Sequence, residues 1–272
     1  MMRKTRFVIA GFGNVGRQIA RHVVKDPSGR LEIAAVAARD RDKARAAAAD
    51  LGLDVPVIAA AEAPDHAPVI VEAGTYESFR AIVEPGLRAG AHVIAVSVGA
   101  LAVNLDLIDL AAETGGTLQI ANGTLPGLDI LRSAREAGIE EVRLVSSMLP
   151  RSLVHEAYIR DNGIDLAQAQ SAAIAIFKGT AREAAAHFPR HFNVAVSLSL
   201  AGIGLDRTLV DISADGRLSG ARHTIHVKSP AVTLEMTSYN LPSPENNRTS
   251  RIVAPSILAA LRTLSAPLRV GS

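Results

Sequence analysis

The sequence contains no cysteine among its 272 residues. Disulfide frameworks and thiolate metal sites are therefore excluded. No window of about 18 uncharged apolar residues occurs, so no membrane-spanning helix is expected. The charges nearly balance, at a net +2, and aromatic residues make up only 3% of the chain. Because no basic stripe with interleaved aromatics occurs, nucleic acid is not a predicted partner.

The hydrophobic content is 48%, enough for one large core or two modest ones. The basic start, MMRKTR, is followed by an apolar run that glycine interrupts too early for a signal peptide. The acidic residues and histidines show no metal-ligand spacing such as H-E-x-x-H. These features predict a soluble cytoplasmic protein without a metal site.

A glycine-rich stretch lies near the N-terminus, in VIAGFGNVGRQIARHVV at residues 8–24. A continuous apolar run precedes the glycines, as in a strand buried on both faces, and apolar residues recur afterwards at helical spacing. This strand–turn–helix setting is typical of a dinucleotide-binding turn, with the phosphates at the helix N-terminus. The expected cofactor contacts in this stretch are Gly11, Gly13, Asn14, Val15 and Gly16.

The end of the next predicted strand, residues 31–37, bears on the choice between NAD and NADP. NAD enzymes usually place an acidic residue there to bind the ribose. This chain has Ala38-Arg39-Asp40-Arg41 instead. A guanidinium can pair with a 2′-phosphate, so Arg39 modestly favours NADP over NAD. Two alternatives stay open: Asp40 binds the ribose, or Arg39 and Arg41 belong to a solvated turn.

Further strands are predicted at residues 68–73, 92–97 and 117–120, with helices at 75–89 and 105–112 between them. Alternating strands and helices indicate a doubly wound parallel sheet, that is, a Rossmann domain over residues 1–122. Ligands of such sheets lie beyond the carboxyl ends of the strands. We therefore expect Thr75, Ser97, Gly99 and Ala100 near the cofactor.

The alternation loosens after residue 122. Helices are predicted at 128–137 and 180–187, and strands at 142–148, 208–213, 224–227 and 232–237. This pattern suits a second α+β domain with a mainly antiparallel sheet, over residues 123–249, for substrate binding and dimerisation. A helical pattern within residues 250–272 is expected to pack back on the first domain. Periodicity does not choose a catalyst among His191, His223 and His226.

Several stretches are specific enough to compare with known families: GFGNVG, SVGAL at 97–101, NGTLPGLD at 122–129, FKGTAREAAAHFPRHFNVAVSLSLAGIGLDRT at 177–208 and SPENNRTSRIVAPSI at 243–257. Together they resemble the L-aspartate dehydrogenase family. The resemblance implies a nicotinamide-dependent amino-acid dehydrogenase that is usually a homodimer and often serves pyridine nucleotide biosynthesis. Homoserine dehydrogenase and dihydrodipicolinate reductase share the architecture, but they fit residues 177–208 poorly.

The resemblance also implies residue roles. The active-site histidine of the family lies in an N-x-H motif, which falls here on Ala221-Arg222-His223 and points to His223 as the catalytic residue. Family contacts to the cofactor fall on Asn193 and on Thr124, which replaces a usual alanine. An imidazole with a pKa near neutrality can exchange a proton with the amine or activate water.

The chain departs from the family on the substrate side. Residues 147–151 read Ser-Met-Leu-Pro-Arg where T-R-K-P-P is usual, so that Leu149 stands in place of a lysine. Ala221 replaces the N-x-H asparagine, and His191 replaces another common asparagine. Charge-assisted hydrogen bonds to a dicarboxylate are each worth roughly 1.5–3 kcal/mol. Aspartate binding therefore requires substitutes, for which Arg151, His191 and Arg222 are the candidates.

Three functions follow as hypotheses. The first is an NAD(P)-dependent dehydrogenase that acts on aspartate or a close relative. The second is a paralogue that reduces another imine or 2-oxo acid, because its pocket is altered at Leu149 and Ala221. The third is a nucleotide-sensing protein without turnover, against which the retention of His223 and Asn193 argues.

Overall fold

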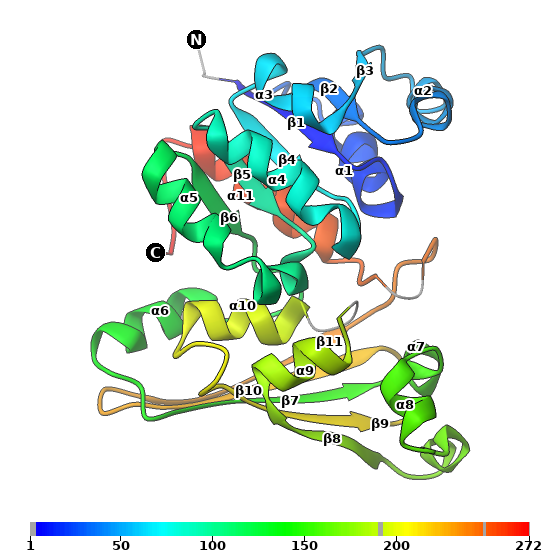
Figure 1. Ribbon diagram of the computed structural model, residues 1–272, viewed down its shortest axis with the longest axis vertical. Coiled ribbons are helices and arrows are strands. Elements are labelled where there is room, and N and C mark those ends of the chain that lie inside the picture. Colours follow the sequence, from blue (N-terminus) through cyan, green and yellow to red (C-terminus); the bar gives the residue numbers. More distant parts are fainter. Residues whose placement is uncertain (1–3, 190–192, 247–248, 272) are drawn as a thin grey trace. The chain divides into compact units, whose positions relative to one another are not determined.

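The computed structural model describes residues 4–189, 193–246 and 249–271. The chain forms two compact units (Figure 1). One unit runs to Gly123 and also includes Val253–Val270, and the other comprises Thr124–Ile252 and Gly271. Residues 253–270, near the end of the chain, therefore belong to the same unit as its beginning.

The first unit contains a six-stranded sheet in the order β3-β2-β1-β4-β5-β6, in which every adjacent pair is parallel. The strands are β1 (Thr5–Ala10), β2 (Leu31–Ala37), β3 (Val57–Ile58), β4 (Val69–Glu72), β5 (His92–Ala95) and β6 (Thr117–Ile120). Phe7, Val8, Ile9 and Ala10 are fully buried, as a strand covered on both faces requires. The predicted doubly wound parallel sheet is confirmed.

Helices cover this sheet (Figure 1): α1 (Asn14–Val24), α2 (Arg41–Ala49), α3 (Ala63–His66), α4 (Phe79–Arg88), α5 (Asp106–Thr114) and α11 (Val253–Ser265). The last of these returns from the second unit and packs against α1 and β1. Thr5 of β1 donates its hydroxyl to the Leu261 carbonyl at 3.3 Å, and Arg262 pairs with Asp26 at 2.9 Å. The amphipathic pattern of α11 thus completes the first core, where Ile257 and Leu261 are buried.

The second unit contains a five-stranded sheet in the order β11-β10-β7-β9-β8. Its strands are β7 (Glu141–Met148), β8 (Ile174–Thr180), β9 (Leu209–Ala214), β10 (Ala221–Lys228) and β11 (Thr233–Asn240). Only β7 and β9 pair in parallel; the other three pairs are antiparallel. The predicted mainly antiparallel second sheet is confirmed.

The two faces of this second sheet differ. Helices α6 (Leu128–Glu136), α9 (Ala181–His187) and α10 (Asn193–Ala201) lie along one face, which we call the inner face (Figure 1). Side chains alternate along a strand, so the buried Leu144, Ser146, His223 and Ile225 belong to the inner face. Ser147, Arg222, Thr224 and His226 belong to the opposite, outer face. The short helices α7 (Pro150–Leu153) and α8 (Ala157–Asp161) follow β7.

The sequence patterns missed some elements. Residues 174–180 form β8 and 193–201 form α10, neither of which was predicted. The apolar residues of α10 lie all around the helix, because it is buried, and they therefore show no amphipathic period. The helix predicted from residue 75 begins at Phe79, after a 3₁₀ turn in which the Thr75 N–H donates to the Ser78 hydroxyl at 2.8 Å. No helix within the described residues is long and apolar enough to cross a membrane.

Candidate functional site

The glycine turn after β1 shows why each glycine is there. Gly11 has a φ of +104°, and a Cβ there would overlap the Ala73 carbonyl group. A Cβ on Gly16 would overlap the Gly11 carbonyl oxygen, since α1 crosses the strand so closely. A Cβ on Gly13 would meet no atom within 4 Å. Gly11 and Gly16 therefore serve the protein's own packing, whereas the space beside Gly13 is open to a ligand.

The start of α1 has the donors that a phosphate needs. Gly13 caps the helix without a side-chain hydrogen bond, and no acidic residue lies in the first turn. The Asn14 Nδ2 is buried and has no hydrogen-bond partner among the residues that the structure describes, although its Oδ1 accepts from Gln18 at 3.2 Å. Helix N-terminal N–H groups and a buried amide donor both favour an anionic acceptor. These residues fit the pyrophosphate of a dinucleotide; Val15, the next residue, is half-buried.

After the end of β2, the two candidate ribose ligands, Arg39 and Asp40, have different surroundings. Asp40 is the N-cap of α2, and its carboxylate accepts the Lys43 N–H at 3.0 Å. Arg39 is exposed, with no hydrogen bond or ion pair to the described residues. Asp40 thus has a structural role in the helix cap, while the Arg39 guanidinium is available to a ligand.

Glu72, at the end of β4, is a buried carboxylate that sequence reasoning missed. It is fully buried and accepts three backbone N–H groups: Gly74 at 2.9 Å, Val96 at 3.0 Å and Ser97 at 2.8 Å. Burial raises the pKa of Glu72, and these hydrogen bonds oppose the rise. The carboxylate holds the ends of β4 and β5 together, next to Thr75 and Ser97. Its signal in the sequence was a lone acidic residue within the apolar run PVIVEA.

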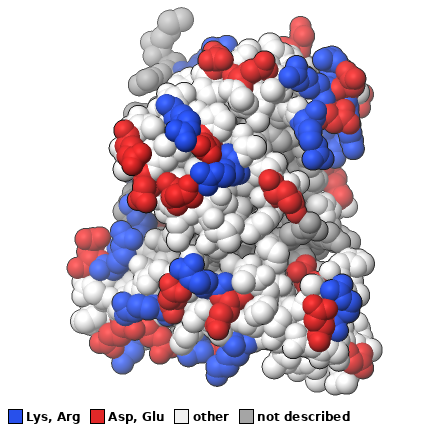
Figure 2. All heavy atoms as spheres, in the orientation of Figure 1, with Lys and Arg blue, Asp and Glu red and all other residues white. Residues whose placement is uncertain are grey.

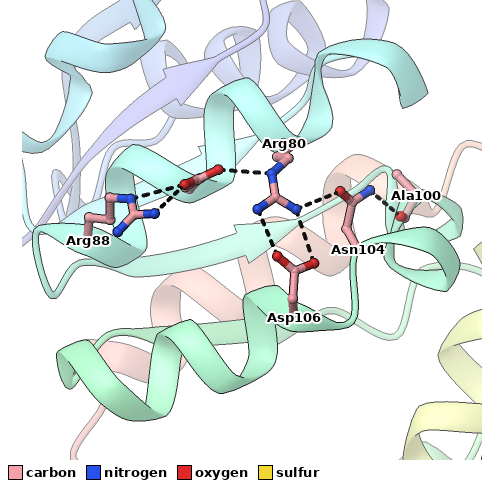
Figure 3. Close-up of polar contacts among 6 residues, drawn as sticks. Arg80, Arg88, Ala100, Asn104 and Asp106 are labelled. Atoms are coloured by element: carbon pink, nitrogen blue, oxygen red, sulfur yellow. Dashed lines mark hydrogen bonds and ion pairs between the residues drawn. The ribbon is translucent and has the colours of Figure 1, made fainter.

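A surface network supports the loop that follows Ser97. Gly99 and Ala100 are buried in a 3₁₀ helix, Val98–Val103, and the Asn104 amide donates to the Ala100 carbonyl at 2.8 Å. Acidic and basic side chains lie next to one another on the surface in the view of Figure 2. Arg80 donates to the Asn104 side-chain oxygen at 3.2 Å and to both carboxylate oxygens of Asp106 (Figure 3). The loop expected to contact the cofactor is thereby tied to α4 and α5.

In the second unit, His223 is buried on the inner face of β10. It is 5% exposed, and its Nδ1 lies 2.8 Å from the hydroxyl oxygen of Ser146 on β7, which is fully buried. Burial lowers the pKa of His223 from 6.5 to about 4. The imidazole is therefore neutral at physiological pH.

The turn that contains Thr124 lies against the neighbouring strand. Ser238, on β11, stands opposite His223 in the ladder, and its hydroxyl donates to the Thr124 carbonyl at 2.9 Å. Asn240 donates in turn to the Ser238 hydroxyl at 2.8 Å. The absence of a side chain at Gly127 leaves room for Met236, also on β11. Thr124 and His223 are thus held on adjacent parts of one sheet face.

The other predicted site residues that the structure describes in the second unit differ in their burial and in their surroundings. Asn193 begins α10 and is half-buried, and Arg151 is exposed in α7. Arg222 is on the outer face, where it donates to Ser147 at 3.1 Å, so the structure does not bring its side chain to His223. His191 lies outside the described residues. No group of metal-binding side chains occurs within the described ranges.

We predict a pH-dependent stability that arises from His223. Because its pKa is lowered by burial, the unfolded state binds a proton below pH 6.5, whereas the folded state does so only near pH 4. This contribution to the free energy of unfolding is fully present above pH 6.5 and is lost as the pH falls toward 4, by about 3 kcal/mol. Urea unfolding of the wild type and His223→Gln across this pH range measures it.

The His223→Gln variant should lack this part of the acid destabilisation. His226→Gln is the matched control, because His226 lies on the same strand but is 40% exposed on the outer face. Identical pH dependence of the wild type and His223→Gln would contradict the assignment.

Comparison with known proteins relates both units of the chain to dehydrogenases. The family described as "Aspartate dehydrogenase, C-terminal" matches residues 129–264, and the NAD binding domain of homoserine dehydrogenase matches residues 11–121. L-aspartate dehydrogenase 3 of Bordetella bronchiseptica is 38% identical, over 97% of this chain and 96% of its own length. The chain belongs to the aspartate dehydrogenase family.

Two further relatives agree with this assignment. An L-aspartate dehydrogenase of Bradyrhizobium diazoefficiens is 39% identical over 98% of this chain and 94% of its own. The crystal structure of aspartate dehydrogenase from Thermotoga maritima superposes with a TM-score of 0.72 over the whole of both chains, at 21% identity, and shows the shared fold. The predicted resemblance and the NAD(P)-binding domain of dehydrogenase type are confirmed.

Within this aspartate dehydrogenase family member, the hydroxyls around His223 are the second feature that sequence reasoning missed. Ser146 and Ser238 lie 77 and 15 residues from His223 along the chain, on different strands. No motif links them to the N-x-H position. Only the strand register brings them onto one face.

Proposed function

We propose that this protein is an NAD(P)-dependent L-aspartate dehydrogenase that interconverts L-aspartate with iminosuccinate, and so with oxaloacetate and ammonia, using His223 as its acid–base residue. The observation that supports this best is the neutral, buried His223 next to the Thr124 turn, at the position of the family's active-site histidine. A neutral imidazole can accept a proton from the substrate amine, whereas an imidazolium cannot.

The proposed oxidation removes one hydride and one proton from the substrate. A nicotinamide cofactor held at Gly13 and Asn14 would supply the acceptor for the hydride from the substrate Cα. His223 takes one proton from the substrate ammonium, which leaves an iminium. Water then adds to that carbon, and ammonium leaves as the oxo acid forms. In the reverse direction, the same side chain returns the proton.

The cofactor would be held mainly by the first unit. Gly13 would admit the pyrophosphate, and Asn14 would donate to it, because its amide nitrogen is buried without an acceptor. The other proposed cofactor contacts are Gly11, Val15, Gly16, Arg39, Thr75, Ser97, Gly99, Ala100, Thr124 and Asn193.

The substrate carboxylates need cationic partners, and we keep two of the three candidate residues. Arg151 is exposed just after Leu149, and His191 follows α9, so both remain proposals. We leave Arg222 out of the proposed substrate contacts, because its side chain points to the outer face of the sheet. Asn240 stands opposite Ala221 in the ladder and is buried, which supplies a polar group where the N-x-H asparagine is replaced.

A second candidate is a paralogue that acts on another imine or 2-oxo acid. Two apolar residues favour it. Leu149 is half-buried, and Ala221 lies on the same sheet face as His223. Two polar substrate contacts of the family are absent at these positions, so a less polar substrate would bind at lower cost.

Initial rates of NADPH and NADH oxidation with oxaloacetate and ammonium test the proposal. Saturable turnover that depends on ammonium supports an aspartate dehydrogenase. Turnover with other 2-oxo acids but not with oxaloacetate would support the paralogue instead. Cofactor binding without turnover on any of these substrates would favour a nucleotide-sensing protein.

We predict that Arg39 sets a preference for NADP. Replacing it with alanine should raise the KM for NADPH by about 10- to 100-fold, since one charge-assisted hydrogen bond is worth roughly 1.5–3 kcal/mol. The KM for NADH should change little. Steady-state kinetics with both cofactors measure the ratio, and Arg41→Ala is the matched control. An equal effect on both cofactors would refute a 2′-phosphate contact.

We also propose a homodimer located in the cytoplasm, which serves amino-acid metabolism and pyridine nucleotide biosynthesis. The family resemblance supports these features. One observation on the outer face of the second sheet agrees with a protein partner there: the Tyr239 side chain is 74% exposed. Sedimentation velocity measures the oligomeric state directly.

A further inference from the structure

The buried partner of His223 is a hydroxyl group. The Ser146 oxygen lies 2.8 Å from Nδ1, and both side chains are buried on the inner face of the second sheet. A hydroxyl can donate to an unprotonated Nδ1 or accept from a protonated one, whereas a carboxylate or carbonyl partner can only accept. Ser146 is therefore compatible with either tautomer of the imidazole.

Hydrogen-bond accounting distinguishes the two tautomers. Nδ1 is the only partner of the Ser146 hydroxyl in the described chain. If the hydroxyl accepted from Nδ1–H, its own proton would be buried without an acceptor, which costs about 1–3 kcal/mol. If it donates to Nδ1, that proton is satisfied, and Nε2 carries the imidazole proton. The other ring nitrogen, Nε2, is not among the fully buried atoms that lack a partner.

The charged side chains around Ser146 and His223 do not alter which tautomer of the imidazole is favoured. Burial alone lowers the pKa of His223. On the flanking strands, Arg143 pairs with Asp211 on the outer face, as does His226 with Glu235. On the inner face, α10 contains no charged residue, and Arg182 of α9 pairs with Asp206. Among the described residues, the Ser146 hydroxyl is thus the one group that makes a hydrogen bond to the His223 ring and selects its tautomer.

We propose that Ser146 is a positioning residue that sets the tautomer of His223: it donates to Nδ1, so that Nε2–H is the resting form. This inference rests on the proposed function for its catalytic meaning. Nε2–H is a donor, suited to the carbonyl or carboxylate oxygen of an oxo acid. Accepting an amine proton at Nε2 first requires the hydroxyl to turn and Nδ1 to become protonated. The resting protein is therefore prepared to bind an oxo acid through a hydrogen bond from Nε2–H, whereas giving up a proton in the reductive direction requires the imidazolium, in which Nδ1 is protonated as well.

The tautomer can be measured without substrate or turnover. Two-dimensional ¹H–¹⁵N spectra of the imidazoles near neutral pH distinguish a protonated Nε2 from a protonated Nδ1, and His223→Gln assigns the signals. We expect a protonated Nε2 in the wild type and a loss of that preference in Ser146→Ala. Ser146→Asp should reverse it, because a carboxylate only accepts. Ser146→Thr should retain it and keeps the test available if the aspartate variant does not fold.

Kinetics supply the second readout. Ser146→Ala should lower the reductive kcat/KM about tenfold, the value of one neutral hydrogen bond, and change the oxidative value less, with the dissociation constant of NADPH unchanged. Ser147→Ala is the matched control, because Ser147 is the next residue on β7 but bonds to Ser213 and Arg222 on the outer face. A protonated Nδ1 in the wild type, or an unchanged tautomer in Ser146→Ala, would overturn the proposal. Absence of turnover with an Nε2 tautomer would instead count against the proposed function alone.

Discussion

Replacing His223 with alanine is expected to lower kcat by about 10²–10⁴-fold, the range in which a positioned acid–base group contributes. His223 is neutral because burial lowers its pKa to about 4, and its Nδ1 is already engaged by Ser146. Only Nε2 is left to exchange a proton with the substrate. Alanine cannot supply that exchange, while the cofactor site in the first unit is untouched.

The experiment compares initial rates of the wild type and His223→Ala with oxaloacetate, ammonium and NADPH, and measures NADPH binding separately by fluorescence. Binding should be unchanged. His226→Ala is the control, because this histidine lies three residues further along β10 with its side chain on the outer face, beside Glu235. A rate within about tenfold of the wild type would fall short of general acid–base catalysis and exclude His223 as that residue. An equal loss in His226→Ala would indicate a structural effect.

The second large effect is expected at the glycine turn, where two neighbouring glycines should respond differently. Gly16→Ala should destabilise the fold by about 1–3 kcal/mol or more, because its Cβ would overlap the Gly11 carbonyl oxygen and lie 3.1 Å from Ile9. The overlapping oxygen belongs to the backbone, and the Ile9 side chain is itself buried, so there is little room to relax. Gly13→Ala should leave stability nearly unchanged, because no atom lies within 4 Å of its Cβ.

Cofactor affinity, in contrast, should respond more directly to the substitution at Gly13 than to the one at Gly16. A methyl group on Gly13 stands where the backbone would approach the pyrophosphate, so we expect the dissociation constant of NADPH to rise by about tenfold or more, that is, by about 1.4 kcal/mol. Thermal unfolding and cofactor titration of the two variants separate the effects. If Gly13→Ala bound NADPH as tightly as the wild type, the open space beside Gly13 would not be the phosphate site.

Much of the first unit was predictable because its signals are local. The strand at residues 31–37 was predicted at its observed bounds, since a parallel strand buried on both faces is a continuous apolar run between turns. The glycine spacing located the tight turn between β1 and α1 for the same reason. In contrast, α10 was missed because a buried helix has no amphipathic period, and β8 because only Ile174 and Ile176 alternate before Lys178 and Gly179.

The candidate site was less predictable, because its partners are distant in sequence. His223 could be named only through the family motif, and its neighbours Ser146 and Ser238 carry no sequence signal. Glu72 was visible as an acidic residue in an apolar run, but its three backbone donors lie just after the ends of two different strands, β4 and β5. Arg222 was expected beside His223, yet adjacent residues of a strand point to opposite faces.

The sequence by itself determined the alternating strands and helices that identify the first unit, the glycine turn and the membership of the family, because periodicity and spacing are properties of neighbouring residues. The tertiary structure alone decided which side chains share a face: Ser146 with His223, Ser147 with Arg222, and Glu72 with the ends of β4 and β5. The physical reason is strand register, which joins residues far apart in the chain and sends each following side chain to the opposite face.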